Sequence, residues 1–322
     1  MPTPAFQNRC RTLLRNFRNE PPSKTPSLIA TVFGDLVEAH GGEIWLGSLT
    51  RLLQPLGISE RLVRTAVYRL SQDGTLEGTR IGRRSFYRLS DTARRRVDHF
   101  DRRIYHFTEP EWDGEWRLLF AGTRGISAEQ RAEIRKRMLW LGYGVVAPNV
   151  YGHPNASVGV LWQLLDELGV TQKVTIMRAS NYDQAHGLGT REMVRQCFDI
   201  DTLDRQYRAF NRRYLPLARA LEGRATGACS DPESSLLLRI ILIHEYRRIL
   251  LRDPDLPTPL LPEAWSGRQA HALCAAIYRA IEADSDAQIR RICENRRGLF
   301  GRVVARHAAR FSTDRAAQVT AN

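Results

Sequence analysis

The 322-residue sequence predicts an α+β protein made of several domains. A single domain usually has roughly 100 to 200 residues, so two or three domains are expected. The chain is 43% hydrophobic and 26% charged, which is an ordinary mixture for a globular protein. Helical patterns occupy both ends of the chain, whereas strand and helix patterns alternate between them.

The chain is strongly basic, with 48 Lys and Arg against 35 Asp and Glu, a net charge of +13 and a pI near 10.1. Arginine carries this charge, because the sequence contains only three lysines. The planar guanidinium matches phosphate oxygens and guanine edges, which favours a nucleic acid or another phosphate-bearing partner. Residues 1–107 carry a net charge of +8 and residues 108–200 carry −1. Phosphate binding is therefore expected in the first third of the chain.

Cysteine and hydropathy patterns argue against a secreted, zinc-binding or membrane-spanning protein. The five cysteines include no C-x-x-C pair, so neither a disulfide framework nor a metal site is expected. The best apolar run, Leu236–Ile243, is interrupted by Arg239 and is too short to span a membrane. The N-terminus has the Arg-rich composition of a transit peptide but no apolar core of a secretory signal, and we favour an N-terminal arm. We expect a cytoplasmic protein without a cofactor.

Three helices and a strand are predicted near the N-terminus. The first helix follows Ser27 and ends at Gly41–Gly42, with its apolar residues on one face. The apolar stretch Ile44–Leu46 is typical of a strand, and Ser48 begins a second helix. Ser59 then caps a third helix that has an apolar inner stripe and a cationic outer stripe.

The second and third helices, joined by a tight glycine turn, fit a helix-turn-helix whose second helix enters the major groove of DNA. Leu76–Leu89 predicts a hairpin, and its tip, Ile81–Ser85, carries two arginines beside a glycine. Such a basic hairpin is a wing, and the whole segment predicts a winged helix. Ser90 then caps a further helix to about Phe107, which is either a connecting helix or a dimer element.

Exposed polar side chains of the third helix and the wing are the candidate DNA contacts. Contacts to base edges are assigned to Arg64, Thr65 and Tyr68. Contacts to phosphates or to the groove are assigned to Arg61, Arg69, Arg80, Arg83 and Arg84. A basic amphipathic helix is often only a solvated face. Here helix, turn, helix and basic hairpin follow in the right order, which favours DNA binding.

The middle of the chain predicts a small ferredoxin-like domain. Strands are expected over Trp116–Ala121, Tyr143–Ala147 and Val174–Ala179, with helices over Ser127–Leu141 and Ser157–Leu168. Residues 148–154 are expected to form a turn. Strands alternating with helices over so short a segment favour the ferredoxin-like sandwich.

The remaining residues predict a helical C-terminal domain, with helices over 190–198, 202–221, 232–252, 266–283 and 286–311. Six consecutive segments result. They are an N-terminal arm (1–26), a winged helix (27–90), a connecting helix (91–110), a ferredoxin-like domain (111–182), a helical domain (183–311) and a tail (312–322).

Eight short motifs follow one another in order over about residues 27–280. They are Gly41–Leu49, Glu60–Ala66, Arg80–Tyr87, Trp112–Gly114, Leu242–Arg248, Asp253–Pro254, Leu260–Pro262 and Trp265–Gly267. Together these motifs resemble the PaaX family of phenylacetic acid degradation repressors.

This resemblance implies a homodimeric repressor of an aromatic-acid catabolic operon, released from DNA by an aryl-CoA thioester, in that family phenylacetyl-CoA. Two recognition helices of a dimer would then read an imperfect palindrome. The family's central domain is similar to a Cas2-like ferredoxin fold, which raises a nuclease alternative. The first central strand ends at Phe120–Thr123 without the carboxylate that metal-dependent cleavage needs, so a scaffold or dimerisation role is favoured.

An aryl-CoA effector needs an aromatic-lined slot flanked by Arg, because it joins an apolar acyl end to phosphates. The residues assigned to this pocket are His244, Tyr246, Arg247, Arg248 and Trp265. Ordinary helix packing is the alternative for each of them, above all for His244. His244–Glu245 also begins a zinc protease motif, which fails because Arg248 occupies the second His position.

Two other classes of function stay open. One is a nucleic-acid-processing or CoA-dependent enzyme built on the central and C-terminal regions, although the sequence contains no nucleophile elbow, P-loop or intact zinc motif. The other is an interaction module that uses the winged helix for protein contacts. We favour a repressor that is not an enzyme.

Overall fold

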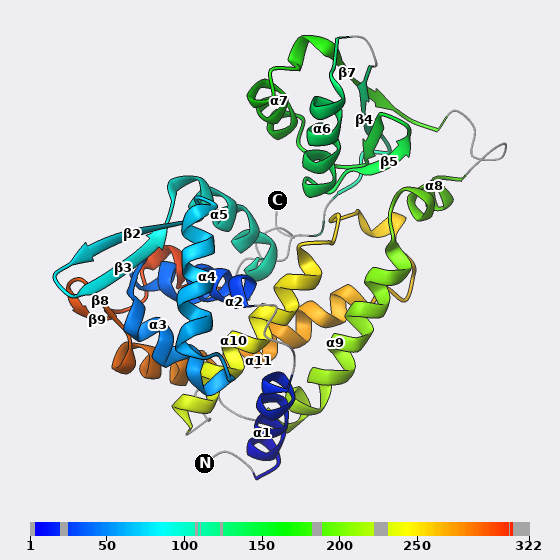
Figure 1. Ribbon diagram of the computed structural model, residues 1–322. Coiled ribbons are helices and arrows are strands. Elements are labelled where there is room, and N and C mark those ends of the chain that lie inside the picture. Colours follow the sequence, from blue (N-terminus) through cyan, green and yellow to red (C-terminus); the bar gives the residue numbers. More distant parts are fainter. Residues whose placement is uncertain are drawn as a thin grey trace. The chain divides into compact units, whose positions relative to one another are not determined.

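The computed structural model describes residues 4–19, 25–106, 109, 111–122, 125–181, 189–221, 231–308 and 310–311. The chain forms two compact units, which Figure 1 shows as ribbons. The first unit contains Met1–Phe107, Ala209–Arg248 and Arg268–Asn322, and the second contains Thr108–Arg208 and Ile249–Gly267. The six segments expected from the sequence stay a prediction, and the expected tail, 312–322, lies outside the described residues.

The N-terminal arm contains a helix, α1 (Pro4–Arg18). Its apolar residues recur at helical spacing and are buried within the first unit. They are Phe6, Cys10, Leu13, Leu14 and Phe17. The arginines of α1 lie on the opposite face and are exposed to solvent. The arm is therefore an amphipathic helix that packs against the rest of its unit.

The winged helix forms as the sequence predicts. The first helix is α2 (Thr25–Val32), which continues through a π-helical turn (Phe33–Val37) and a 3₁₀ turn (Glu38–His40). Then follow β1 (Glu43–Trp45), α3 (Leu46–Leu53), α4 (Glu60–Gln72), β2 (Leu76–Ile81) and β3 (Arg84–Leu89). The three strands form an antiparallel sheet in the order β1-β3-β2.

Serine caps set the limits of two of these helices. Ser59 accepts a hydrogen bond from the Leu62 amide at 3.4 Å, so α4 begins where the sequence predicts. Ser90 does the same for α5 (Asp91–Tyr105) through the Ala93 amide at 3.2 Å. Ser48 was expected to begin a helix but lies inside α3, because its buried hydroxyl accepts the amide of Glu294 at 3.0 Å instead.

The second unit contains a ferredoxin-like sandwich. Its elements are β4 (Trp116–Ala121), α6 (Ala128–Trp140), β5 (Gly144–Ala147), β6 (Val150–His153), α7 (Val158–Glu167) and β7 (Val174–Ala179). The antiparallel sheet has the order β5-β6-β4-β7. Leu119 of β4, Ile134 of α6 and Leu161 of α7 belong to one buried cluster, so both helices cover the same face of the sheet.

The prediction of a turn over residues 148–154 is wrong, because β6 occupies most of them. The chain reverses at Asn149, whose φ of 61° makes the β5–β6 connection very short. Pro148, Gly152 and Pro154 gave the segment a turn-like composition. Gly152 is needed within the strand, since an added Cβ would lie 2.8 Å from the Val146 side chain. The additional strand completes the βαββαβ order of the ferredoxin-like fold.

The C-terminal region is helical, with α8 (Thr190–Cys197), α9 (Ile200–Leu221), α10 (Pro232–Leu250) and α11 (Ser266–Ile292). Separate helices over 266–283 and 286–311 were expected, and this prediction is wrong. The cap-like residue Ser285 lies inside α11, where its hydroxyl donates to the Glu282 carbonyl at 2.8 Å. After α11 the chain forms a hairpin of two short strands, β8 (Glu294–Asn295) and β9 (Gly298–Leu299).

A buried ionic network joins the winged helix to the C-terminal helices within the first unit. Asp35 lies in the π-helical turn after α2 and is 3% exposed. Its carboxylate accepts hydrogen bonds from Arg239 at 2.8 Å, from Arg310 at 3.2 Å and from the Tyr105 hydroxyl at 2.6 Å. The Gly34 carbonyl accepts a further bond from Arg310 at 3.0 Å.

Each of the two arginines has a second carboxylate partner. Arg239 donates to Asp286 at 2.7 Å, and Arg310 donates to Asp101 at 2.9 Å. Burial opposes ionisation of Asp286, but the His40 hydrogen bond and the charge of Arg239 outweigh it and lower its pKa. Arg239, which interrupted the apolar run in the sequence, is therefore a structural cation.

Replacing Asp35 with Ala should destabilise the protein by about 3 to 5 kcal/mol, because two buried guanidinium groups lose their shared carboxylate. Urea unfolding measures this change. Glu77→Ala is the control, since Glu77 pairs with Arg88 on the surface, where both side chains are about half exposed, and its loss should cost less than about 1 kcal/mol. Equal losses for the two variants would contradict a structural role for the network.

Candidate nucleic-acid interface and ligand cleft

Helix α4 has one buried and one exposed face. Val63, Ala66, Val67 and Leu70 pack into the winged helix. The polar residues assigned to DNA from the sequence all lie on the exposed face, and they are Arg61, Arg64, Thr65, Tyr68 and Arg69. Tyr68 is 65% exposed, which is unusual for a large aromatic residue without a ligand or partner. The exposed face therefore has the groups that base edges and phosphates bind.

Two of these side chains make local contacts along the helix. Arg64 donates to Glu60 one turn earlier at 2.8 Å, and both side chains are about 60% exposed. An exposed pair of this kind is worth at most about 1 kcal/mol, so Arg64 can exchange Glu60 for DNA at little cost. The Thr65 hydroxyl donates to the Arg61 carbonyl at 2.9 Å, which fixes its orientation.

The wing carries arginines of two kinds. Gly82 turns the tip with a φ of 58°, and Arg80 donates to its carbonyl at 3.2 Å. Arg83 is exposed beside it. Arg84, in contrast, lies 4.4 Å from the centre of the Trp45 ring and donates to Glu294 at 2.7 Å. Arg80, Arg83 and Arg84 are all exposed, and Arg84 in addition braces the wing through Glu294; its predicted contact with DNA stays a prediction.

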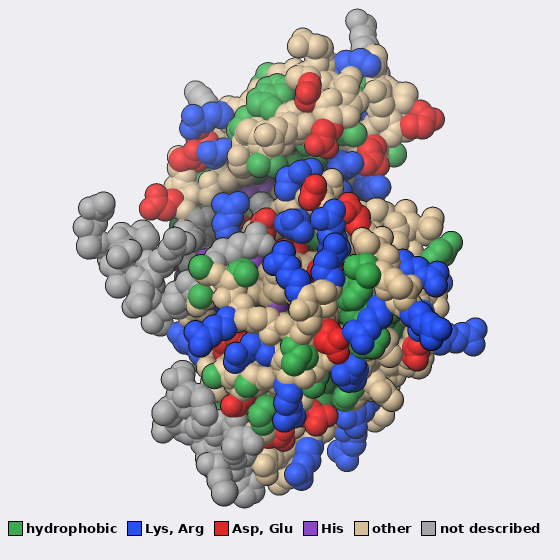
Figure 2. Space-filling model, turned by 90° about the vertical axis from the view of Figure 1, so that its left-hand side faces the viewer, with side chains coloured by type: hydrophobic (Ala, Val, Ile, Leu, Met, Phe, Trp, Pro, Cys, Tyr) green, Lys and Arg blue, Asp and Glu red, His purple; other side chains and the backbone are tan. Residues whose placement is uncertain are grey.

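The surface around the wing is basic. Figure 2 shows Lys and Arg side chains gathered over this face of the first unit. The hairpin β8–β9 adjoins the winged helix and carries two arginines at its turn, Asn295–Gly298. We did not predict this hairpin from the sequence. Asn295 and Gly298 are typical turn residues, and their place within the helix predicted over 286–311 was a signal of the hairpin in the sequence.

The residues assigned to an effector from the sequence lie in different surroundings. His244 is fully buried and its Nδ1 lies 3.2 Å from the Thr31 hydroxyl. Tyr246 is 2% exposed and its hydroxyl lies 3.2 Å from His271 Nδ1. Trp265 belongs to the second unit, where it packs edge-on against Tyr207. Both His244 and Tyr246 therefore have the surroundings of core residues.

Arg247 and Arg248, the other two residues assigned to the effector, lie near the end of α10 and are partly buried. Burial lowers the pKa of Arg247. Both arginines are nevertheless more exposed than His244 and Tyr246, and their role stays a prediction.

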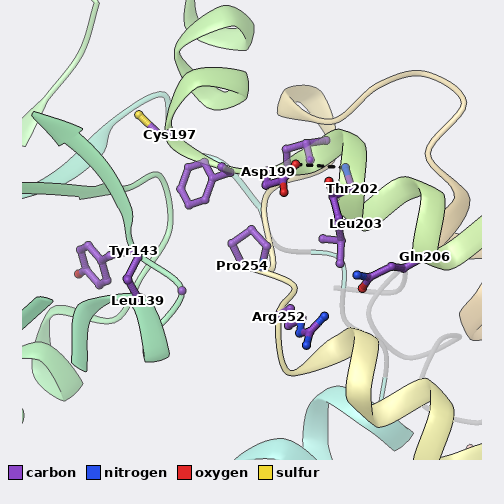
Figure 3. Close-up of a pocket in the computed structure, with 12 residues that line it drawn as sticks. Leu139, Tyr143, Cys197, Asp199, Thr202, Leu203, Gln206, Arg252 and Pro254 are labelled. Atoms are coloured by element: carbon purple, nitrogen blue, oxygen red, sulfur yellow. Dashed lines mark hydrogen bonds between the residues drawn. The ribbon is translucent and has the colours of Figure 1, made fainter. Parts of the chain in front are cut away.

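A cleft of about 280 Å³ lies within the second unit (Figure 3). Its apolar lining includes Leu139, Tyr143 and Leu203, and its polar lining includes Gln206 and Arg252. In Figure 3, Leu203, Gln206 and Arg252 lie to one side of Pro254, and Leu139 and Tyr143 lie to the other. The cleft thus combines apolar walls with a guanidinium, as an amphiphilic anion requires.

The segment after α10 that carries Arg252 is held in place by two hydrogen bonds, and a third holds its far end at the start of α11. His153 of β6 lies 2.7 Å from the Pro254 carbonyl oxygen through Nε2. The Tyr207 hydroxyl donates to Asp253 at 2.7 Å, and the Ser266 amide donates to Asp204 at 3.0 Å. The wall of the cleft is therefore a fixed part of the second unit.

Comparison with known proteins covers most of the chain. Residues 24–93 match the family described as PaaX-like protein, residues 109–193 match the PaaX protein central Cas2-like domain, and residues 198–291 match the PaaX-like protein C-terminal domain. The chain belongs to the PaaX family. It is 37% identical over 270 residues, 84% of each chain, to a protein of Escherichia coli (strain K12) named transcriptional repressor PaaX.

Among solved structures, the chain is similar to an uncharacterized protein, Rv0674, from Mycobacterium tuberculosis. The two are 24% identical with a TM-score of 0.49, over 80% of this chain and 96% of the other. The PaaX matches confirm the predicted α+β organisation, with its Cas2-like centre. The C-terminal match ends before the β8–β9 hairpin.

The described part of the chain contains no group of three or more His, Cys, Asp or Glu side chains placed to hold a metal ion. None of the helices in those residues has the length and apolar composition that a membrane span requires.

The stability of the PaaX-family fold should fall as the pH is lowered from 6.5 to about 4. Burial, together with the charge of Arg279, lowers the pKa of His271 from 6.5 to about 4. In that range the unfolded chain binds a proton that the folded protein excludes, so stability is present above pH 6.5 and declines below it by up to about 1.4 kcal/mol per pH unit. Urea unfolding at several pH values should give a shallower decline for His271→Gln. Parallel curves for the two proteins would contradict this assignment.

Proposed function

We propose that this protein is a DNA-binding transcriptional repressor of a phenylacetate catabolic operon. The observation that carries the proposal is the exposed cationic face of α4 next to a basic wing, in a chain related to a named transcriptional repressor. Family membership favours a regulator over the enzyme alternatives. A regulator of this kind acts in the cytoplasm, where its operator is.

DNA recognition would use two sets of side chains on the winged helix, one for base edges and one for phosphates. Arg64, Thr65 and Tyr68 point from α4 to the base edges of the major groove, and Arg61 and Arg69 flank them at the phosphates. Arg80 and Arg83 lie at the wing tip for the adjacent backbone or minor groove. A homodimer would present two such helices to the half-sites of an imperfect palindrome, and thereby block the promoter.

We further propose that an aryl-CoA thioester such as phenylacetyl-CoA releases the repressor. The cleft in the second unit offers apolar walls for an aryl group and Arg252 for a phosphate. Trp265 of the same unit stays a candidate for the remainder of so large a ligand, and Arg247 and Arg248 of the first unit stay a separate candidate site on α10. A thioester that binds the DNA-incompetent conformation more tightly lowers operator affinity by that difference, without covalent chemistry.

Arg64→Ala and Tyr68→Ala should each lower operator affinity by about ten- to hundredfold, because each removes a contact to a base edge. Fluorescence anisotropy with DNA from upstream of the protein's own operon, and with a scrambled duplex, measures the change at two salt concentrations. Arg69→Ala is the control, since loss of a phosphate contact should weaken binding to both duplexes alike. A variant at Arg64 that keeps its preference for the operator would overturn the proposed recognition.

Phenylacetyl-CoA should release the operator, whereas free phenylacetate should not, because only the thioester supplies both the aryl group and the phosphates. Arg252→Ala should raise the thioester concentration needed for release at least about tenfold and leave operator affinity unchanged. Arg135→Ala on α6 removes an exposed charge of the same unit outside the cleft and serves as the matched control. If Arg248→Ala alone reduces the response, the effector binds at α10 and not in the cleft.

A further inference from the structure

The β8–β9 hairpin is fixed to the winged helix by side chains from three of its elements. Glu294 of β8 accepts the guanidinium of Arg84 from β3 at 2.7 Å. Its backbone amide donates to Ser48 of α3 at 3.0 Å. Arg296, at the hairpin turn, donates to Glu43 of β1 at 2.8 Å. The hairpin therefore belongs to the winged helix in space, although more than 200 residues separate it from β3.

The hairpin and its flanks are strongly basic. Residues 290–302 contain five arginines and one carboxylate, Glu294. Glu294 and Glu43 compensate Arg84 and Arg296, and these pairs fix the position of the hairpin. The hairpin thus leaves an excess of positive charge beside the wing, where Figure 1 places β8 and β9 next to β2 and β3.

Arg297, at the tip of the hairpin, is a cation that this arrangement leaves for a ligand. It is exposed at the turn, and no hydrogen bond or ion pair joins its guanidinium to another residue in the described part of the chain. The turn itself is well defined, because the Arg297 amide donates to the Asn295 side chain at 2.8 Å and Gly298 adopts a φ of 116°. The turn fixes the backbone from which the Arg297 side chain extends, so ligand binding has to order the side chain but not the backbone.

We propose that the β8–β9 hairpin is a second wing, whose Arg297 binds a backbone phosphate of DNA next to the site contacted by the β2–β3 wing. This inference rests on the DNA-binding function proposed above. The hairpin has two residues in each strand, which is too short to enter a groove, so a phosphate is the group within its reach. Arg297 also adds a positive charge, unpaired within the described residues, beside the wing, where the charge of Arg84 is already balanced by Glu294.

A phosphate contact has a signature that a base contact lacks. Neutralising one phosphate contributes about 0.9 to the slope of log affinity against log salt concentration, whatever the sequence of the DNA. Arg297→Ala should therefore lower the slope by about 0.9 and weaken binding about fivefold near 0.15 M salt, for the operator and for a scrambled duplex alike. Arg297→Lys should keep the slope, because it keeps the charge.

The full-length protein is titrated with both duplexes over a range of salt concentrations, and thermal unfolding of each variant is measured in parallel. Arg11→Ala is the matched control, since Arg11 is an exposed arginine of the same unit on α1 and its loss changes the net charge equally. If Arg297→Ala and Arg11→Ala have the same slope and affinity, the second wing is refuted. If Arg64→Ala abolishes operator preference in the same experiment, that refutation leaves the proposed repressor intact. Wild-type protein without operator preference would instead overturn both proposals.

Discussion

The carboxylate of Asp35 is the constraint on which the first unit depends. It lies in the first helical segment of the winged helix, yet its partners are Arg239 of α10 and Arg310 near the end of the described chain. A buried carboxylate without these cations would carry a large desolvation cost, and without it each cation would keep only its second carboxylate, Asp286 or Asp101. The winged helix is therefore not a separable module with a linker. It shares one ionic core with the C-terminal helices, and its wing is braced by the same region through Glu294.

The winged helix could be read from the sequence because its signals are local. Ser59 caps α4 and a four-residue spacing of apolar side chains defines its inner face, so position along the chain was enough to identify the exposed stripe. The same holds for the glycine at the wing tip. These features depend on neighbours within one turn or one hairpin. The family resemblance rested on the same local motifs and is confirmed by the PaaX matches.

The features that the sequence did not reveal depend on distant partners. Ser285 and Asp286 have the composition of a helix cap, but both are bound by Arg239, 46 and 47 residues away, so α11 continues through them. The buried position of His244 is explained by its contact with the hydroxyl of Thr31, which lies 213 residues earlier in the chain. The strand β6 was hidden because its glycine is required by a neighbouring strand and not by a turn. In each case the partner that decides the role of the residue lay outside any local window of the sequence.

Arg310 follows Asp35 by 275 residues, and this separation has a consequence for synthesis. A ribosome extends a chain at about 5 to 20 residues per second, and segments near the N-terminus emerge first. The nascent winged helix thus appears well before its buried carboxylate has any cation to meet. Its final packing waits until Arg239 and Arg310 have both been synthesised. The ionic core that the winged helix shares with the C-terminal helices is therefore completed only at the end of synthesis, and until then the N-terminal segments lack partners that they have in the folded unit.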